Sequence, residues 1–162
     1  MAGNYRISVG GVTLETNYEV FFGVKGLLTR TDGRVLIVRE SAIYRDGTEL
    51  GKWDVVGGRI DPTESLYDGL RREIKEESGL DVEIGKVLGI TENFIEIRGE
   101  ACHIIRAYFA CAVVGNASVT LSCDHDAYEW IDPATHKDWN LMSDLHGIFD
   151  DFLLQSRHAD TI

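Results

Sequence analysis

Cysteine and histidine occur in this 162-residue sequence without any pattern typical of a disulfide or metal site. The three cysteines, Cys102, Cys111 and Cys123, are an odd number without CxxC spacing, and the five histidines show no pairing at ligand spacing. These absences disfavour a disulfide framework, a zinc site and a cysteine nucleophile. Two of the cysteines lie in or beside apolar segments, so we expect buried, reduced thiols in a cytosolic protein.

Targeting and membrane-spanning segments are also missing from the sequence. The first eleven residues, MAGNYRISVGG, lack the basic-then-apolar order of a signal peptide. The longest uninterrupted apolar run, residues 107–114, is far shorter than the ~20 residues that a membrane-spanning helix needs. No Pro/Ser-rich linker or internal repeat divides the chain. We therefore expect a cytoplasmic protein without a membrane partner, with residues 1–162 forming a single domain.

Basic residues are few, because 16 lysines and arginines stand against 27 aspartates and glutamates, for a formal net charge of −11. Non-specific nucleic-acid binding relies on clustered Lys and Arg at the phosphates, so no nucleic-acid partner is expected. A phosphorylated small molecule stays compatible with this charge, because bound metal cations reverse the local sign.

Alternating and β-branched segments predict a protein built largely on strands. Residues 5–16 alternate around Gly10–Gly11, which indicates a hairpin or an N-terminal arm within residues 1–18 that could pair with a second subunit in a homodimer. Asp32–Gly33 lies between two β-branched runs and favours another hairpin. The predicted fold class is α/β with a mixed sheet. Its expected elements are strands at 19–29, 34–39, 53–56, 82–90, 103–114 and 127–131, a loop at 40–52, a central helix and a final helix at 143–155.

Residues 58–80, GRIDPTESLYDGLRREIKEESGL, contain the central helix, and its ends are well marked. Asp61 is the predicted N-cap, Pro62 the first helical residue, and Gly79 a left-handed stop. The predicted buried stripe consists of three apolar residues spaced four apart: Leu66, Leu70 and Ile74.

Three glutamates, Glu73, Glu76 and Glu77, crowd the end of this helix and border its buried stripe. Glu73 and Glu77 return close to the direction of the stripe, and Glu76 lies about 80° to one side. One interpretation is a solvent-exposed charged helix with pairs such as Arg72–Glu76. The partly buried like-charge pair instead favours a bound divalent cation, and hard oxygen ligands favour Mg²⁺ or Mn²⁺. Gly57, just before the helix, would let a main-chain carbonyl approach as a further ligand.

The spacing of these residues resembles the Nudix box. A glycine is followed after five residues by a glutamate, after seven more by Arg-Glu, and then by a Glu-Glu pair, a glycine and a leucine. Every defined position of the box is filled: Gly58, Glu64, Arg72, Glu73, Ile74, Glu76, Glu77, Gly79 and Leu80. The order of predicted elements also resembles the Nudix α/β/α sandwich, with a mixed central sheet and a loop-helix-loop catalytic motif.

The resemblance implies a metal-dependent hydrolase for the pyrophosphate bond of a nucleoside diphosphate linked to another moiety. Its small-molecule substrate would be a nucleotide, a nucleotide sugar, ADP-ribose or a nucleoside triphosphate. Glu73, Glu76, Glu77 and the Gly57 carbonyl would bind Mg²⁺, with Mn²⁺ as the other candidate ion, and Glu76 or Glu73 would orient or deprotonate the attacking water. A structural role is implied for the other box residues: Gly58, Glu64, Arg72 and Gly79.

The sequence departs from the family pattern at two places around the box. Val56 replaces the proline that often precedes the glycine pair, which loosens the approach loop. The strand after the box ends at residues 112–115 without an acid, so a further ligand or general base would come from elsewhere. The candidates are three glutamates that are otherwise expected on the surface: Glu96, Glu100 and Glu129.

Substrate contacts outside the box have weaker signals. Arg39 ends a predicted strand and Arg45 lies in the following loop, and either could meet a phosphate. Four aromatic residues could stack on a base, although core packing is the default for those in strands: Trp53, Phe94, Tyr108 and Trp130.

Other functions are compatible with the fold but have less support. The main alternative is a non-catalytic Nudix-like domain that senses a nucleotide, and the complete box disfavours it. An isomerase acting on a non-nucleotide diphosphate has no dedicated signal. RNA decapping is disfavoured by the net charge of −11 and by the lack of an accessory domain.

Overall fold

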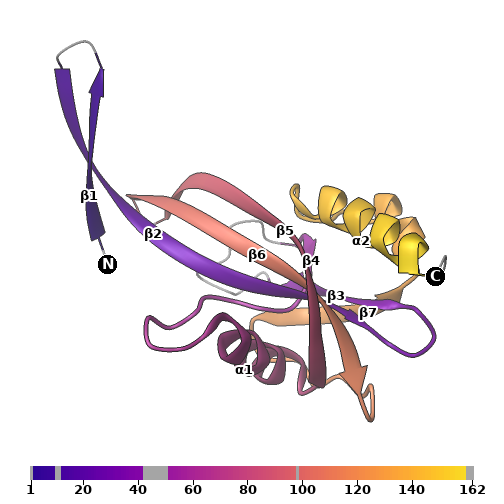
Figure 1. Ribbon diagram of the computed structural model, residues 1–162. Coiled ribbons are helices and arrows are strands. Elements are labelled where there is room, and N and C mark those ends of the chain that lie inside the picture. Colours follow the sequence, from indigo (N-terminus) through magenta and orange to yellow (C-terminus); the bar gives the residue numbers. More distant parts are fainter. Residues whose placement is uncertain (1, 10–11, 42–50, 98, 160–162) are drawn as a thin grey trace.

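The architecture comes from a computed structural model of the chain, shown in Figure 1, which describes residues 2–9, 12–41, 51–97 and 99–159. In chain order its elements are β1 (Ala2–Val9), β2 (Val12–Thr29), β3 (Val35–Glu40), β4 (Trp53–Asp54), α1 (Leu66–Ser78), β5 (Asp81–Ile97), β6 (Glu100–Val114), β7 (His125–Ile131), the 3₁₀ helix η1 (Pro133–Asp138) and α2 (Leu145–Ala159).

The strands form one mixed sheet, in the order β4-β3-β2-β6-β5, with β1 paired to β2 and β7 paired to β3. The β2–β6 pair is parallel and the other pairs are antiparallel, so the expected mixed sheet is confirmed. The Asp32–Gly33 turn joins β2 to β3, with Gly33 at a φ of 81°. The β1–β2 hairpin extends beyond the body of the molecule (Figure 1).

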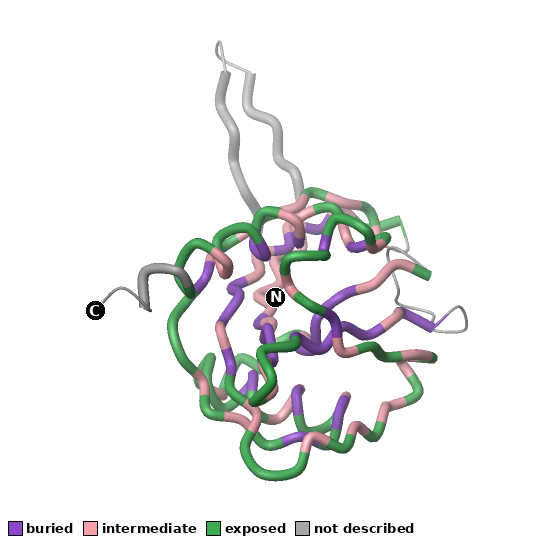
Figure 2. The backbone as a smooth tube through the Cα atoms, turned by 90° about the vertical axis from the view of Figure 1, so that its right-hand side faces the viewer, coloured by how far each residue is buried: buried purple, intermediate pink, exposed green. Residues whose placement is uncertain are grey.

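The two helices pack on opposite faces of the sheet, which makes the expected α/β/α sandwich (Figure 1). Apolar side chains alternate along β2 and β6, so each face of the sheet carries its own core. Leu70 and Ile74 of α1 are fully buried against one face, and Leu145 and Phe149 of α2 are fully buried against the other. Figure 2 shows these buried segments in the middle of the body, inside exposed outer segments.

Helix α1 begins later than the sequence indicated. Its N-cap is Ser65, whose hydroxyl oxygen accepts a hydrogen bond from the Asp68 amide, so the prediction of Asp61 as the cap was wrong. The Asp61 amide donates instead to the Glu64 carboxylate at 2.7 Å. Leu66, expected in the buried stripe, is 36% exposed and is the first residue of the helix. The helix ends at Gly79, with a φ of 72°.

Two further expectations, on the cysteines and on strand β5, have clear outcomes. Cys102 and Cys111 are buried free thiols, whereas Cys123 is an exposed one. Strand β5 runs on to Ile97, beyond the predicted 82–90, because it pairs with β6 along its whole length through two irregularities. No helix in the part of the chain that the structure describes is long and apolar enough to cross a membrane.

Candidate active site at the glycine pair and helix α1

The loop before α1 lies against the centre of the sheet. Backbone hydrogen bonds of 2.9 Å join Val24 N–H to Gly58 O and Gly26 N–H to Val56 O. Gly57 has a φ of 128°, and a Cβ on it would lie 2.2 Å from the Val24 carbonyl oxygen. Only glycine fits this close approach, so the loop backbone is held within reach of the helix.

Glu77 is fixed by this loop. Its carboxylate accepts a hydrogen bond of 2.7 Å from the Gly57 amide. Burial raises the pKa of Glu77 to about 7, although the Lys25 ammonium and the Gly57 amide both favour its charged form. A buried carboxylate of this kind gains stability from any cation that binds beside it.

Glu73 lies one helical turn earlier, directly under Gly58. A Cβ on residue 58 would lie 2.5 Å from the Glu73 Oε2 atom, so glycine is needed here for the carboxylate rather than for the backbone. Burial raises the pKa of Glu73 above its ordinary value, and the Arg72 guanidinium at 2.8 Å opposes this shift. Glu73 and Glu77 therefore face the loop together.

Arg72 links the helix to the start of the loop. Its guanidinium donates to both carboxylate oxygens of Glu64, at 2.6 and 3.2 Å, and to the Arg59 carbonyl at 3.1 Å. These hydrogen bonds from Arg72, with that from the Asp61 amide, lower the pKa of Glu64. The same guanidinium lies 3.2 Å from the Glu76 carboxylate, whose side chain is 59% exposed.

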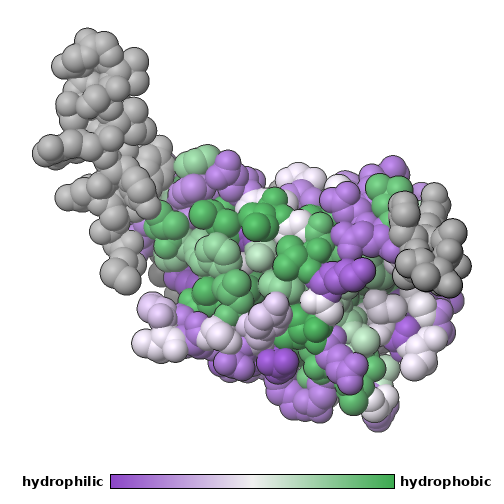
Figure 3. Space-filling view, in the orientation of Figure 1, coloured by the Kyte–Doolittle hydropathy of each residue, from purple (hydrophilic) through white to green (hydrophobic). Residues whose placement is uncertain are grey.

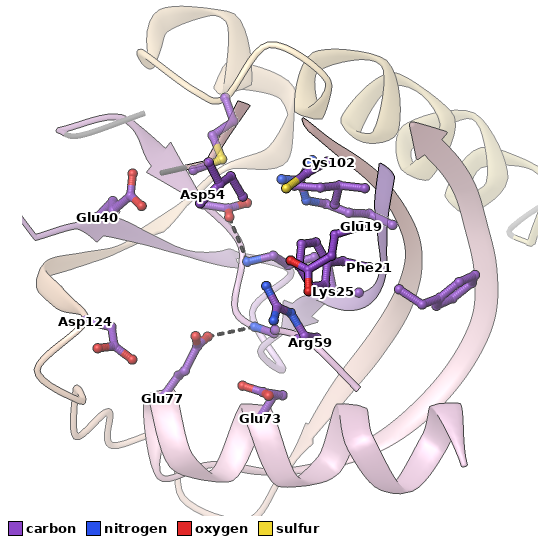
Figure 4. A pocket seen from close by; sticks show the side chains of 18 of the residues that line it. Glu19, Phe21, Lys25, Glu40, Asp54, Arg59, Glu73, Glu77, Cys102 and Asp124 are labelled. Atoms are coloured by element: carbon purple, nitrogen blue, oxygen red, sulfur yellow. Dashed lines mark hydrogen bonds and ion pairs between the residues drawn. The ribbon is translucent and has the colours of Figure 1, made fainter. Parts of the chain in front are cut away.

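A cavity of about 610 Å³ opens above the loop and the helix. Figure 4 shows Glu73 and Glu77 at one side of it, with Arg59 between them and Phe21. Acids line the cavity together with Gly57 and Gly58, and apolar side chains line its other part. The acids are Glu19, Glu40, Asp54, Glu73, Glu77, Glu100 and Asp124; the apolar residues are Phe21, Phe22, Ile97, Cys102, Ile104 and Met142.

Two partly buried ion pairs near the cavity were not predicted from the sequence. Lys25 lies 2.7 Å from Asp54 and also donates to the Val55 carbonyl at 3.2 Å. Burial disfavours the charged form of Lys25, but Asp54 and Glu77 outweigh it and raise the pKa of the ammonium. Arg106 lies 3.6 Å from Asp144. Only the folded chain reveals these partners, because Lys25 of β2 and Asp54 of β4 are 29 residues apart in the sequence.

The predicted phosphate and base contacts lie elsewhere. Arg39 does not line the cavity and pairs with Asp126 at 2.6 Å, and Arg45 falls outside the described residues. Of the aromatic candidates, Tyr108 is buried in the core and Phe94 is exposed on β5. The phenylalanine rings that line the cavity are Phe21 and Phe22, two consecutive residues of β2.

The three candidate acids outside the box differ in their position relative to the cavity. Glu100 lines the cavity, whereas Glu96 and Glu129 are exposed and do not. Asp54 and Asp124, which do line it, had no signal of their own in the sequence. Within the described ranges, no three His, Cys, Asp or Glu side chains are grouped in a way that could hold a metal ion as they stand.

The donor set nevertheless suits a hard divalent cation. Glu73 and Glu77 present carboxylate oxygens whose charged forms are disfavoured by burial, and Gly57 brings main-chain atoms close to them. Oxygen ligands without thiolate or paired imidazole are those preferred by Mg²⁺ and Mn²⁺.

Comparison with known proteins identifies the family of this chain. The family model of the NUDIX domain matches residues 21–152. A MutT-like protein of Streptomyces ambofaciens is 31% identical over 110 residues, which cover 68% of this chain and 62% of that protein. The nucleoside triphosphatase NudI of Klebsiella pneumoniae is 27% identical over 121 residues, covering 70% of this chain and 84% of NudI.

The fold has a close counterpart among solved structures. The crystal structure of a MutT protein from Methanosarcina mazei superposes with a TM-score of 0.72 at 28% identity, and the match covers 86% of this chain and 96% of that one. Because the family model spans most of the chain and includes the whole box, the chain belongs to the NUDIX family and is a Nudix hydrolase.

Proposed function

We propose that this Nudix hydrolase cleaves the pyrophosphate bond of a nucleoside triphosphate or of a related nucleoside diphosphate derivative, with a divalent cation. The observation that carries the proposal is the pairing of Glu73 and Glu77 with Gly58 and Gly57 at one side of a cavity. The likeness to NudI, described as a nucleoside triphosphatase, supports a nucleoside triphosphate as substrate.

Mg²⁺ is the proposed cofactor, and Mn²⁺ would satisfy the same ligands. Glu73, Glu76, Glu77 and the Gly57 carbonyl would hold the ion. When bound, it would neutralise phosphate charge and lower the pKa of a coordinated water.

The protein's own groups prepare the acidic side of the site. The Gly57 amide and the Lys25 charge favour the ionised form of Glu77 in a buried position. Arg72 holds the loop and the helix together through Glu64 and the Arg59 carbonyl. Glu76 or Glu73 would orient or deprotonate the attacking water: Glu73 lines the cavity, and Glu76, whose side chain is 59% exposed, lies 3.2 Å from Arg72.

The cavity fits such a substrate. A volume of about 610 Å³ lies in the range typical of small-molecule sites. Its acidic side suits a cation with phosphates, and Phe21, Phe22, Ile97 and Ile104 provide apolar surface for a base on the other side.

A product screen tests the proposal. Purified protein would be incubated with nucleoside di- and triphosphates, nucleotide sugars, ADP-ribose and dinucleotides, with Mg²⁺, with Mn²⁺ and with chelator. We expect cleavage only with a divalent ion, and its loss in the Glu76→Gln and Glu77→Gln variants. Tight nucleotide binding without product over hours would contradict hydrolysis and favour a sensing role.

Homodimer formation, a cytoplasmic location and a single domain over residues 1–162 stay predictions. Strand β5 is an edge strand of the sheet, and two of its apolar residues are exposed: Ile90 at 66% and Phe94 at 62%. Figure 3 shows apolar surface gathered on the face where β2 and β6 lie in front. Edge strands with exposed apolar side chains favour association, so we expect light scattering to give twice the chain mass.

A further inference from the structure

Arg59 follows the glycine pair, and its backbone is fixed on both sides. It forms an isolated antiparallel bridge with Gly23 of β2. Its carbonyl oxygen accepts a hydrogen bond of 3.1 Å from the Arg72 guanidinium. The side chain therefore starts from a rigid point beside Gly58 and Glu73.

The guanidinium of Arg59 lies over an aromatic ring in the wall of the cavity. Its Cζ atom is 3.5 Å from the centre of the Phe21 ring. A cation over an aromatic face is attracted by the ring, and the contact restricts a long, flexible side chain. The edge of the guanidinium, which carries its N–H donors, is left to other partners.

The other cations that line the cavity already have carboxylate partners. Lys25 is paired with Asp54 at 2.7 Å, and Arg106 lies 3.6 Å from Asp144. In the described part of the chain, the Arg59 guanidinium forms no hydrogen bond or ion pair with another residue, although it lines the same cavity. It is thus the lining cation whose donors are available to an anion.

Arg59 lies between the acidic side of the cavity and its apolar side. Figure 4 shows it between Glu73 and Glu77 on one side and Phe21 on the other. A nucleotide with its phosphates near the two glutamates and its base along the apolar wall would pass this guanidinium. A planar guanidinium donates two parallel hydrogen bonds to phosphate oxygens, which a lysine cannot do.

We propose that Arg59, held on the Phe21 ring, is a phosphate-binding residue of the substrate pocket. Its donors would contact phosphate oxygens next to the scissile bond, so it would select substrates that carry at least two linked phosphates. This inference rests on the proposed pyrophosphohydrolase function and deepens it.

Binding of two non-hydrolysable probes tests Arg59 separately from turnover. α,β-Methylene-ATP carries phosphates and a base, whereas imidodiphosphate carries phosphates alone. Calorimetry with Mg²⁺ would compare the wild type with Arg59→Gln, Arg59→Lys, Phe21→Leu and a matched control, Arg30→Gln. Arg30 also lies over an aromatic ring, at 4.9 Å from Trp130, but pairs with Asp32 in a surface turn.

We expect Arg59→Gln to weaken binding of both probes by roughly tenfold to a hundredfold, the range for one or two hydrogen bonds to a charged group. Arg59→Lys keeps the positive charge but not the paired N–H donors, so its affinity for the probes should be intermediate. Phe21→Leu should weaken binding of the probes by about threefold to tenfold. Arg30→Gln should bind as the wild type does. Because the Arg59 side chain is exposed, we expect the variants to unfold at the same thermal midpoint as the wild type. Equal midpoints would exclude a structural effect of the substitutions.

Each outcome decides between the two proposals. If the wild type binds and cleaves substrates but Arg59→Gln binds both probes equally well, the role of Arg59 is refuted and the proposed function stands. If Arg59→Gln weakens α,β-methylene-ATP but not imidodiphosphate, the residue contacts the base, which also refutes phosphate binding. If the wild type neither binds the probes nor releases products, the proposed function itself fails.

Discussion

The Gly57 amide donates a hydrogen bond of 2.7 Å to the Glu77 carboxylate. This contact joins the loop before α1 to the last turn of the helix, 20 residues further along the chain. It orients the Glu77 carboxylate toward the cavity and keeps the loop backbone beside it, which is the arrangement that the proposed hydrolytic site depends on.

Gly57→Ala should be among the most destabilising single changes in the chain. The added Cβ would lie 2.2 Å from the Val24 carbonyl and would require a φ of 128° that L-residues disfavour. We expect a loss of about 2–5 kcal/mol in the free energy of unfolding, measured by urea denaturation. Gly33→Ala is the control, because its φ is 81° but no atom lies within 4 Å, and it should cost only about 1–2 kcal/mol. Equal losses would contradict the close approach at Gly57.

Gly58→Ala should affect activity more than stability. Its Cβ would collide with the Glu73 carboxylate, the movable end of a side chain, rather than with backbone. We expect kcat to fall by at least about tenfold, since small displacements of a catalytic group have effects of this size. Thermal unfolding should show a midpoint close to that of the wild type. A variant with full kcat would show that the position of Glu73 is unimportant for the reaction.

The Lys25–Asp54 pair should matter for folding because both groups are buried. Lys25→Met removes one partner and leaves Asp54 uncompensated, so we expect a cost of about 3–5 kcal/mol in urea denaturation. The double change Lys25→Met with Asp54→Asn removes both charges and should recover part of that loss. If the double variant is no more stable than Lys25→Met, the two residues are not energetically coupled.

His136 should make the stability of the protein sensitive to pH. It is 1% exposed, stacks on Phe149, and hydrogen-bonds to His146 and Asp150 at 3.2 and 3.1 Å. Burial lowers its pKa, although Asp150 opposes the shift. The unfolded chain then binds a proton that the folded chain rejects, so the contribution of His136 to stability is retained above about pH 6.5 and declines as the pH falls toward the folded-state pKa.

The measurement is the unfolding midpoint at a series of pH values in this window. His136→Gln should flatten the decline, because the residue that resists protonation is gone. His103→Gln, at a histidine paired with Glu92 at the surface of β5 and β6, should leave it in place. A decline that persists unchanged in His136→Gln would assign the effect to other groups.

The central helix, the box and the succession of strands along the chain were predictable because each leaves a local signal in the sequence. Glu73 and Glu77 stood out by their like charge at a partly buried position, and Gly79 by its place at the helix end. The N-cap prediction was wrong because Asp61 and Ser65 are both residue types that cap helices. In the structure Glu64 binds Arg72 and the Asp61 amide, and residues 61–64 belong to the loop before the helix.

The walls of the cavity could not be predicted in the same way. Phe21, Lys25 and Arg106 lie on strands whose alternation shows which side chains share a face, but not what covers that face. Their neighbours come from the parallel β2–β6 pairing, which joins residues about 80 positions apart. Arg39 had the right chemistry for a phosphate, yet its strand directs it to Asp126.

The most direct test of the hydrolytic site is phosphorus NMR of a nucleoside triphosphate incubated with the wild type and with Glu77→Gln in Mg²⁺. We expect new product signals with the wild type, none with chelator, and a rate at least about a hundredfold lower for Glu77→Gln, with the variant still folded. Signals that grow at the same rate with Glu77→Gln as with the wild type would contradict it.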